Sequence, residues 1–203
     1  MCSTTIHLVP RPDRHRAELV AATVQLLRRQ GYSATRLTEF LQAADATNGS
    51  LYHHFPGGKE ELARAAIDVV AGQVKTALQD TLDATDDIAL ATQTWIDGPI
   101  AALDADPRDG CPVAPTALGA ASISEPLRTT AAAAFAGWSD AFERSLARSR
   151  DTSTAREQAS VLLSAIEGAL LLDRTAHSTT HLRALRAAVP ALLSHAQPAT
   201  GRN

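Results

Sequence analysis

The chain has 203 residues, of which 45% are hydrophobic and 20% are charged, and its formal net charge is −3. This length and apolar content can supply a buried core and exclude wholesale disorder. Alanine makes up about a fifth of the chain and aromatic residues only 4%, so the composition favours helices over sheets and predicts an all-α protein.

The first 55 residues predict an arm and three helices. Residues 1–12, with two prolines, are expected to form a loose arm. Asp13 is placed to cap a first helix, whose apolar positions recur at helical spacing up to Gly31. Thr35 is placed to cap a short second helix, and a tight break at Asp45 follows. Thr47 is placed to cap a very short third helix, which ends before Pro56.

Six longer segments follow with helical periodicity. A long helix is expected from about Lys59 to Leu82, with two glutamates in its first turn, where the helix dipole favours acids. Further helices are predicted at roughly 87–103, 112–122, 125–149, 153–176 and 179–195. The chain should therefore contain about nine helices.

Residues 35–59 have the layout of a helix-turn-helix, with a short helix, a tight turn and a second short helix. The second helix has a polar first turn, and Leu51 and Phe55 lie four residues apart on its opposite side. A helix that enters a DNA major groove needs such a polar exposed end and an apolar side that packs on the protein. Thr47 could equally be only a helix cap, and Arg36 only a surface arginine. The residues expected to face DNA are Arg36, Thr47, Asn48, Gly49, Ser50, Tyr52, His53 and Lys59.

The charge distribution supports a local anionic partner only weakly. Residues 1–60 carry a formal charge of +2 and residues 61–203 a charge of −5.

No stretch approaches the ~18 apolar residues of a membrane helix, and residues 1–7 lack the features of a signal peptide. We therefore expect no membrane association and a cytoplasmic location. Two cysteines, Cys2 and Cys111, cannot build a disulfide framework.

Several runs resemble one family of bacterial repressors. Residues 31–35 (GYSAT) and 48–55 (NGSLYHHF) resemble the DNA-binding domain of the TetR family. Residues 55–62 and 110–113 resemble its LmrA/YxaF-like branch. The sequence departs from the family pattern at Asp45, where glycine is usual, and at Asn48, where many members have lysine or proline.

The resemblance implies an all-α homodimer in two parts. Residues 1–58 would form the arm and a three-helix DNA-binding head, and residues 59–203 a ligand-binding and dimerising body. It also implies that Tyr52 and Lys59 bind phosphates of double-stranded operator DNA, and that the effector is a small apolar, often aromatic molecule.

The helix expected at 153–176 is apolar nearly all round, so it must bury two faces. One face can pack within the chain, and the other needs a partner, although a central helix in a monomer remains an alternative. We expect a four-helix dimer interface. Its residues would be Leu162, Ala165, Ala169, Leu172, Leu182, Leu185, Val189 and Leu192.

A ligand pocket is expected among the helices between residues 59 and 175. Each candidate could instead be an ordinary core residue, and a redox role for Cys111 has no support in its neighbours. The candidates are Trp95, Ile96, Ile100, Cys111, Val113, Leu118, Phe135, Trp138, Phe142, Ile166 and Leu170.

Enzyme motifs are incomplete. The run Gly57–Glu60 lacks the first glycine and the final Ser/Thr of a P-loop, and neither H-E-x-x-H nor G-x-S-x-G occurs. We expect no enzyme activity, no metal and no cofactor. The sequence favours a ligand-responsive transcriptional repressor that binds a palindromic operator. The alternatives are an activator on the same scaffold and a helical small-molecule-binding protein whose DNA head is non-functional.

Overall fold

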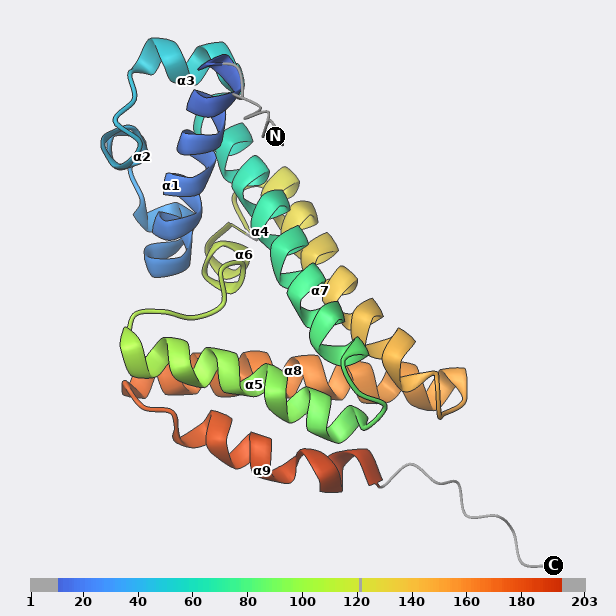
Figure 1. The fold of residues 1–203 in the computed structure, drawn as a ribbon. Helices are drawn as coiled ribbons and strands as arrows, with labels where there is room; N and C mark the ends of the chain where they lie inside the picture. The colour runs from blue at the N-terminus through green and yellow to red at the C-terminus, as the bar shows by residue number, and fades with distance from the viewer. Residues whose placement is uncertain (1–10, 121, 195–203) are drawn as a thin grey trace, which may run out of the picture.

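The computed structural model describes residues 11–120 and 122–194, and within these it contains nine helices and no strand (Figure 1). The predicted all-α class is confirmed. The expected arm falls mostly on residues 1–10, which lie outside the described residues, as does Cys2. The helices are α1 (Arg11–Ala34), α2 (Leu37–Ala43), α3 (Asn48–His54), α4 (Gly58–Asp83), α5 (Ile88–Ala105), α6 (Ala114–Ala120), α7 (Glu125–Leu146), α8 (Thr152–Ala176) and α9 (Thr180–Ser194).

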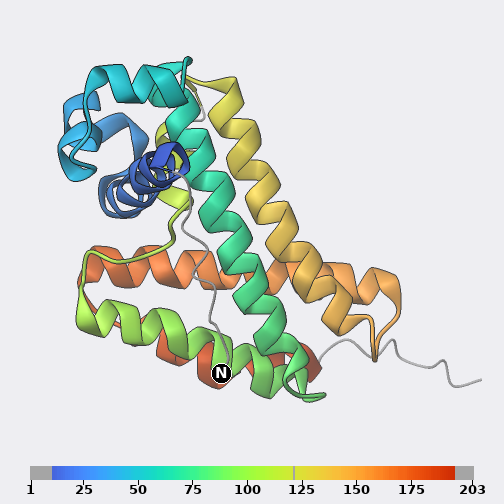
Figure 2. The same cartoon turned by 45° about the horizontal axis from the view of Figure 1, so that its top comes forward.

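Helices α1 to α3 form a head at one end of the molecule, and α4 leads from this head into the body (Figure 1). In the body α4 packs along α7, while α5, α8 and α9 form a second layer that crosses this pair (Figures 1 and 2). Helix α6 lies between α1 and α7 and contacts both. None of the helices in the described part of the chain is long and apolar enough to span a membrane.

The first helix differs from expectation at its start, since it begins at Arg11 and Asp13 lies within it. At Gly31 the backbone leaves helical geometry, with φ 73° and ψ 179°, as expected for the end of the first helix. A short helical segment then completes the span of α1 to Ala34. A Cβ atom at Gly31 would lie 2.9 Å from the carbonyl oxygen of Pro115 in α6. Glycine at this position therefore permits both the positive φ and the close approach of α6.

The expected cap of the second helix was also wrong. Thr35 is buried, and its hydroxyl donates a hydrogen bond to the carbonyl oxygen of Gly31 at 2.6 Å. The N-cap is Arg36, whose backbone N–H donates to the Glu39 carboxylate at 2.5 Å. The Thr35 hydroxyl therefore holds the backbone at the end of α1 and is not available to cap α2.

The last helix is held by a buried acid at the end of α8. Asp173 accepts hydrogen bonds from the backbone N–H groups of His181 and Leu182 at 2.9 and 2.8 Å, and from the hydroxyl of Ser178 at 3.2 Å. These N–H groups belong to the first turn of α9, which has no partners for them within the helix. The carboxylate of α8 therefore fixes where α9 begins.

Candidate functional site

The turn between α2 and α3 uses a left-handed residue. Asp45 has φ 48°, and the N–H of Ala46 donates to the carbonyl oxygen of Leu41 at 2.9 Å. Aspartate tolerates this conformation better than most residues other than glycine. The tight break that the sequence predicts at Asp45 is therefore present, with aspartate where the family usually has glycine.

Helix α3 is buried on one side and polar on the other. Leu51 and Phe55 are 0% and 1% exposed, and they fix the helix against the head. The Thr47 hydroxyl accepts the N–H of Ser50 at 3.2 Å, so Thr47 is the N-cap. The outer side of the helix presents polar groups to solvent. The exposed residues there are Thr47, Asn48, Gly49, Tyr52 and His53, with Ser50 half-buried.

Tyr52 is held against the start of α4. It is 53% exposed, and one side of its ring lies so close to Gly58 that a Cβ atom at Gly58 would be 3.2 Å from Cε1. Gly58 itself has φ 68°, a conformation that favours glycine. One side of the Tyr52 ring therefore faces the backbone at Gly58, and the other side is open to solvent.

Lys59 has a partner inside the head. Its ammonium group donates to the carbonyl oxygen of Tyr32 at 2.9 Å and lies 4.0 Å from the centroid of the Tyr32 ring. Burial lowers the pKa of Lys59, and the nearby Glu39 carboxylate opposes this. Lys59 thus links the start of α4 to the end of α1. A phosphate contact could use its remaining N–H donors and stays a prediction.

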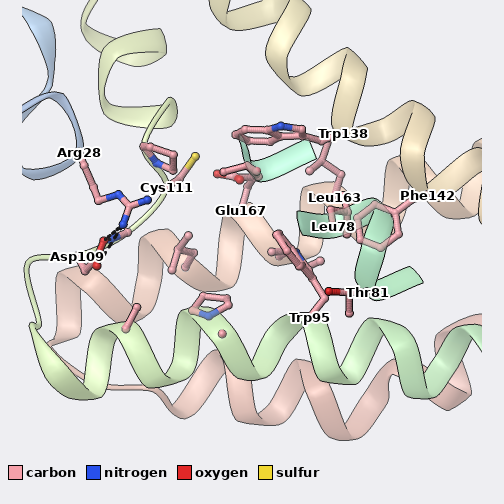
Figure 3. A pocket seen from close by; sticks show the side chains of 18 of the residues that line it. Arg28, Leu78, Thr81, Trp95, Asp109, Cys111, Trp138, Phe142, Leu163 and Glu167 are labelled. Carbon is pink, nitrogen blue, oxygen red and sulfur yellow. Dashed lines mark hydrogen bonds and ion pairs between the residues drawn. The ribbon is translucent and has the colours of Figure 1, made fainter. Parts of the chain in front are cut away.

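A cavity of about 400 Å³ lies in the body, bordered by α4, α5, α7 and α8 and by residues 109–112 (Figure 3). The indole N–H of Trp138 donates to the carbonyl oxygen of Ala71 at 3.0 Å, so its ring is fixed at the wall. Helix α4 contributes Val74, Leu78 and Thr81. Six of the predicted residues line this cavity, namely Trp95, Cys111, Trp138, Phe142, Ile166 and Leu170.

The other predicted pocket residues lie elsewhere. Ile96, Ile100 and Val113 are buried in the core, on helix or loop faces turned away from the cavity. Phe135 packs edge-on against Trp138, with ring centroids 5.4 Å apart, and supports the wall from behind. Leu118 is 71% exposed and borders a second hollow of about 350 Å³ beside α1 and α8.

The sequence reasoning missed three charged residues at the cavity. Arg28 of α1 and Asp109 of the α5–α6 segment form an ion pair, with Nη1 and Oδ1 3.3 Å apart. Glu167 of α8 lines the same cavity. A signal for Glu167 was present, because it interrupts the otherwise apolar stretch between Ala165 and Leu172. The pair of Arg28 and Asp109 is joined only by tertiary folding.

The surroundings of Cys111 favour a structural role for this residue over a reactive one. Its sulfur accepts the N–H groups of Val113 and Ala114 at 3.4 and 3.3 Å, just before α6. Burial raises the pKa of the Cys111 thiol, and the neighbouring Glu167 charge adds to this. A protonated thiol is a poor nucleophile. In the described part of the chain, no group of three or more His, Cys, Asp or Glu side chains is arranged to hold a metal ion.

The predicted dimer residues divide into two sets. Leu162, Leu182 and Val189 are at most 1% exposed within the single chain, and Ala169 is also buried. They join α8 and α9 to each other and to the body, so they are not available to a partner. Leu172 and Leu192 are 52% and 38% exposed, and Ala165 and Leu185 are half-buried. The periodicity of the sequence could not separate the inner stripe from the outer one.

Side chains from the body also form hydrogen bonds and an ion pair with the last turns of α1. The Arg174 guanidinium of α8 donates to the carbonyl oxygen of Arg28 at 3.0 Å and to that of Arg29. Arg29 pairs with Asp106 at 3.2 Å. These contacts satisfy carbonyl groups that the kink at Gly31 leaves without helical partners. They tie the head to α8 and to the loop that borders the cavity.

Two family models match separate parts of the chain. A family model described as "Bacterial regulatory proteins, tetR family" matches residues 19–66, and one described as "Transcriptional regulator LmrA/YxaF-like, C-terminal domain" matches residues 88–188. The chain is 32% identical to the HTH-type transcriptional regulator LmrA of Bacillus subtilis over 180 residues, which are 88% of this chain and 96% of that protein. It is 33% identical to the uncharacterized HTH-type transcriptional regulator YxaF of the same organism, over 88% and 94% of the two chains. The fold matches that of E. coli NemR in its reduced form with a TM-score of 0.77 at 22% identity, covering 88% of this chain and 96% of that one.

Proposed function

Because the chain belongs to the TetR family of bacterial transcriptional regulators, in its LmrA/YxaF-like branch, we propose that it is a repressor that releases its operator when an effector binds. The observation that carries the proposal is the shape of α3. Its polar outer side is exposed, while Leu51 and Phe55 lock its rear side into the head. In this proposal Thr47, Asn48, Ser50 and His53 lie near base edges, and Tyr52 and Lys59 bind phosphates.

The proposed repressor acts as a homodimer, so that two α3 helices read the half-sites of a near-palindromic operator. Exposed apolar residues on the outer side of α8 and α9 support this. Val161 and Leu172 are both 52% exposed, and Leu192 is 38% exposed. Between the first two, a Cβ atom at Gly168 would meet nothing within 4 Å. The outer side of α8 could therefore admit the close approach of a partner helix.

The effector would bind in the cavity and act on the head through α4. This helix borders the cavity at Val74, Leu78 and Thr81 and begins at Gly58, shortly after α3 ends at His54. A ligand that prefers one orientation of α4 would bias the spacing of the two heads. Coupling is reciprocal, so bound operator would lower effector affinity by the same factor.

The proposal is tested by titrating the protein against the intergenic DNA upstream of its own gene, over a range of salt concentrations, with scrambled DNA as competitor. Tight binding that depends on sequence and on salt, by a dimer, is the expected result. Binding no stronger than to the scrambled DNA would contradict it and would favour a ligand-binding protein with a non-functional head.

Lys59→Gln is expected to reduce the slope of log affinity against log salt by about one, because one phosphate contact is lost. The matched control is Lys75→Gln, which removes the same charge from the same helix α4 but in the body. The control slope should equal that of the wild type. An unchanged slope for Lys59→Gln would remove Lys59 from the DNA contacts and leave its bond to Tyr32 as its role.

Leu172→Glu is expected to weaken the dimer at least tenfold, since a carboxylate would be buried in an apolar interface without a partner (about 1.4 kcal/mol or more). Val69→Glu is the control, because Val69 is 43% exposed on α4, a helix whose main contacts are with α1, α5 and α7. Sedimentation over a range of concentrations measures both. Equal dimer stability for the two variants would place the interface elsewhere.

A further inference from the structure

The proposal that the cavity binds an effector leaves the chemistry of the effector open, and the charges in its wall restrict it. Among the described residues that line the cavity, three carry charge: Arg28, Asp109 and Glu167. The first two neutralise each other, with their nearest atoms 3.3 Å apart. The wall as a whole therefore has the charge of one carboxylate, at Glu167.

Glu167 has no cationic partner within the described part of the chain. Glu167 also borders the second hollow, which Arg29, Arg174 and His177 line. Both arginines have other partners there, Arg29 with Asp106 and Arg174 with two carbonyl oxygens, and Arg28 is paired with Asp109. The neighbour of Glu167 is the Cys111 thiol, a weak donor. Burial raises the pKa of the Glu167 carboxyl, and the thiol opposes this. An ionised carboxylate at this place costs free energy unless a cation accompanies it.

Aromatic rings border the same space. In Figure 3 the Glu167 side chain points into the cavity, which Trp95, Trp138 and Phe142 also border. Since the Trp138 N–H is already bonded to Ala71, that residue presents an apolar ring to the cavity and no donor. Aromatic faces attract cations through their negative quadrupole, and more strongly where water is excluded. A carboxylate without a cationic partner and several aromatic rings are complementary to a cation with an apolar body.

We propose that the effector is an organic cation with an aromatic or apolar body, whose charge is neutralised by Glu167 and whose body packs against Trp95, Trp138 and Phe142. This inference rests on the proposed effector site and specifies the class of molecule that it takes. The cation supplies the charge that Glu167 lacks in the free protein. A neutral molecule of the same shape fills the same space but leaves the carboxylate without a counter-ion.

The probes are 2-naphthyltrimethylammonium and its neutral isostere 2-tert-butylnaphthalene, which differ in charge and hardly in shape. Because a naphthalene ring absorbs and emits in the same range as tryptophan, binding is measured by equilibrium dialysis, and the variants at Glu167 and Glu157 report on the site. We expect the cation to bind at least about tenfold more tightly than the isostere. The isostere binding as tightly as the cation, or neither probe binding at millimolar concentration, would overturn the proposal.

Glu167→Gln keeps the shape of the side chain and removes its charge, and should abolish the preference for the cation while leaving the isostere bound. The matched control is Glu157→Gln, an exposed position on the same helix α8, where the preference should persist. A preference that persists in Glu167→Gln, or disappears in Glu157→Gln, would also overturn the proposal.

Operator binding by the same preparations separates the two proposals. If the protein binds its operator but shows no preference for the cation, the inference about Glu167 fails and the proposed repressor stands. If the protein prefers the cation but does not bind operator DNA, the proposed function fails and the cation site stands. If both hold, the cation should release the operator from the wild type at concentrations that leave the Glu167→Gln complex intact.

Discussion

Asp173→Ala is expected to lower the free energy of unfolding by about 3 kcal/mol, because it removes several hydrogen bonds to one buried charge. Asp173 is 0% exposed and accepts from the N–H groups of His181 and Leu182. The variant leaves these donors at the start of α9 without their partner. Since α9 belongs to the expected dimer interface, dimer stability should fall too. Chemical denaturation and sedimentation measure the two effects.

The control is Asp151→Ala, which also removes a capping carboxylate from α8. Asp151 accepts the N–H of Thr154 at 3.0 Å, but it is exposed and caps the start of α8, whereas Asp173 lies in the last turns of α8 and binds the start of α9. The Asp151→Ala variant should lose clearly less free energy of unfolding than Asp173→Ala, and its dimer should stay intact. Equal losses for the two variants would show that Asp173 acts only as an ordinary helix cap.

The stabilisation of the folded protein by Asp173 should depend on pH and should be lost in acid. Burial alone would raise the pKa of Asp173, but the hydrogen bonds from Leu182, His181 and Ser178 outweigh burial and hold the pKa below its ordinary value. The unfolded chain therefore takes up the proton first as pH falls. The stabilisation is fully present above the unfolded pKa of about 3.9 and is lost as pH falls through the folded pKa. The difference in the free energy of unfolding between wild type and Asp173→Ala should thus be constant near neutral pH and should shrink in acid.

Gly31→Ala should destabilise the protein by about 2–3 kcal/mol and weaken operator binding, because φ 73° with ψ 179° is a conformation that other residues adopt only at a cost of about 1–3 kcal/mol. The new Cβ would also lie 2.9 Å from the Pro115 carbonyl oxygen, which is backbone and can move only with α6. The head would therefore shift relative to α6. Thermal unfolding and the operator titration measure the two consequences.

Gly72→Ala is the matched control for this variant. Gly72 lies inside α4 in a helical conformation, and a Cβ atom there meets nothing within 4 Å. Alanine at this position should raise stability by about 0.5–1 kcal/mol, because glycine in a helix carries an entropic cost. A Gly31→Ala variant as stable as this control would show that the kink is not required.

The head could be predicted closely because its signals are local. Thr47, Leu51 and Phe55 are few residues apart, and their caps and spacing define α3 without reference to the rest of the chain. The turn at Asp45 likewise depends on one residue's tolerance of positive φ. The cap at Asp13 was predicted wrongly because α1 already begins at Arg11, and the cap at Thr35 because its hydroxyl is buried in the head on the Gly31 carbonyl oxygen.

The cavity was predicted less well because a helix has more than one buried face. Trp95 and Ile96 are adjacent in α5, yet the first borders the cavity and the second lies in the core. The same holds on α8, where Leu162 is buried within the chain and Leu172 is exposed. Hydrophobic periodicity shows that a face is buried, but not against which neighbour.

By itself the sequence determined the all-α class through its composition, and the helix-turn-helix and the family through motifs whose residues lie close together in the chain. Tertiary structure alone decided which charges meet. It paired Arg28 with Asp109, engaged Arg174 with the end of α1, and left Glu167 without a cation beside two tryptophans. The physical reason is that electrostatic partners depend on distance and burial, which are set when helices from distant parts of the chain pack together.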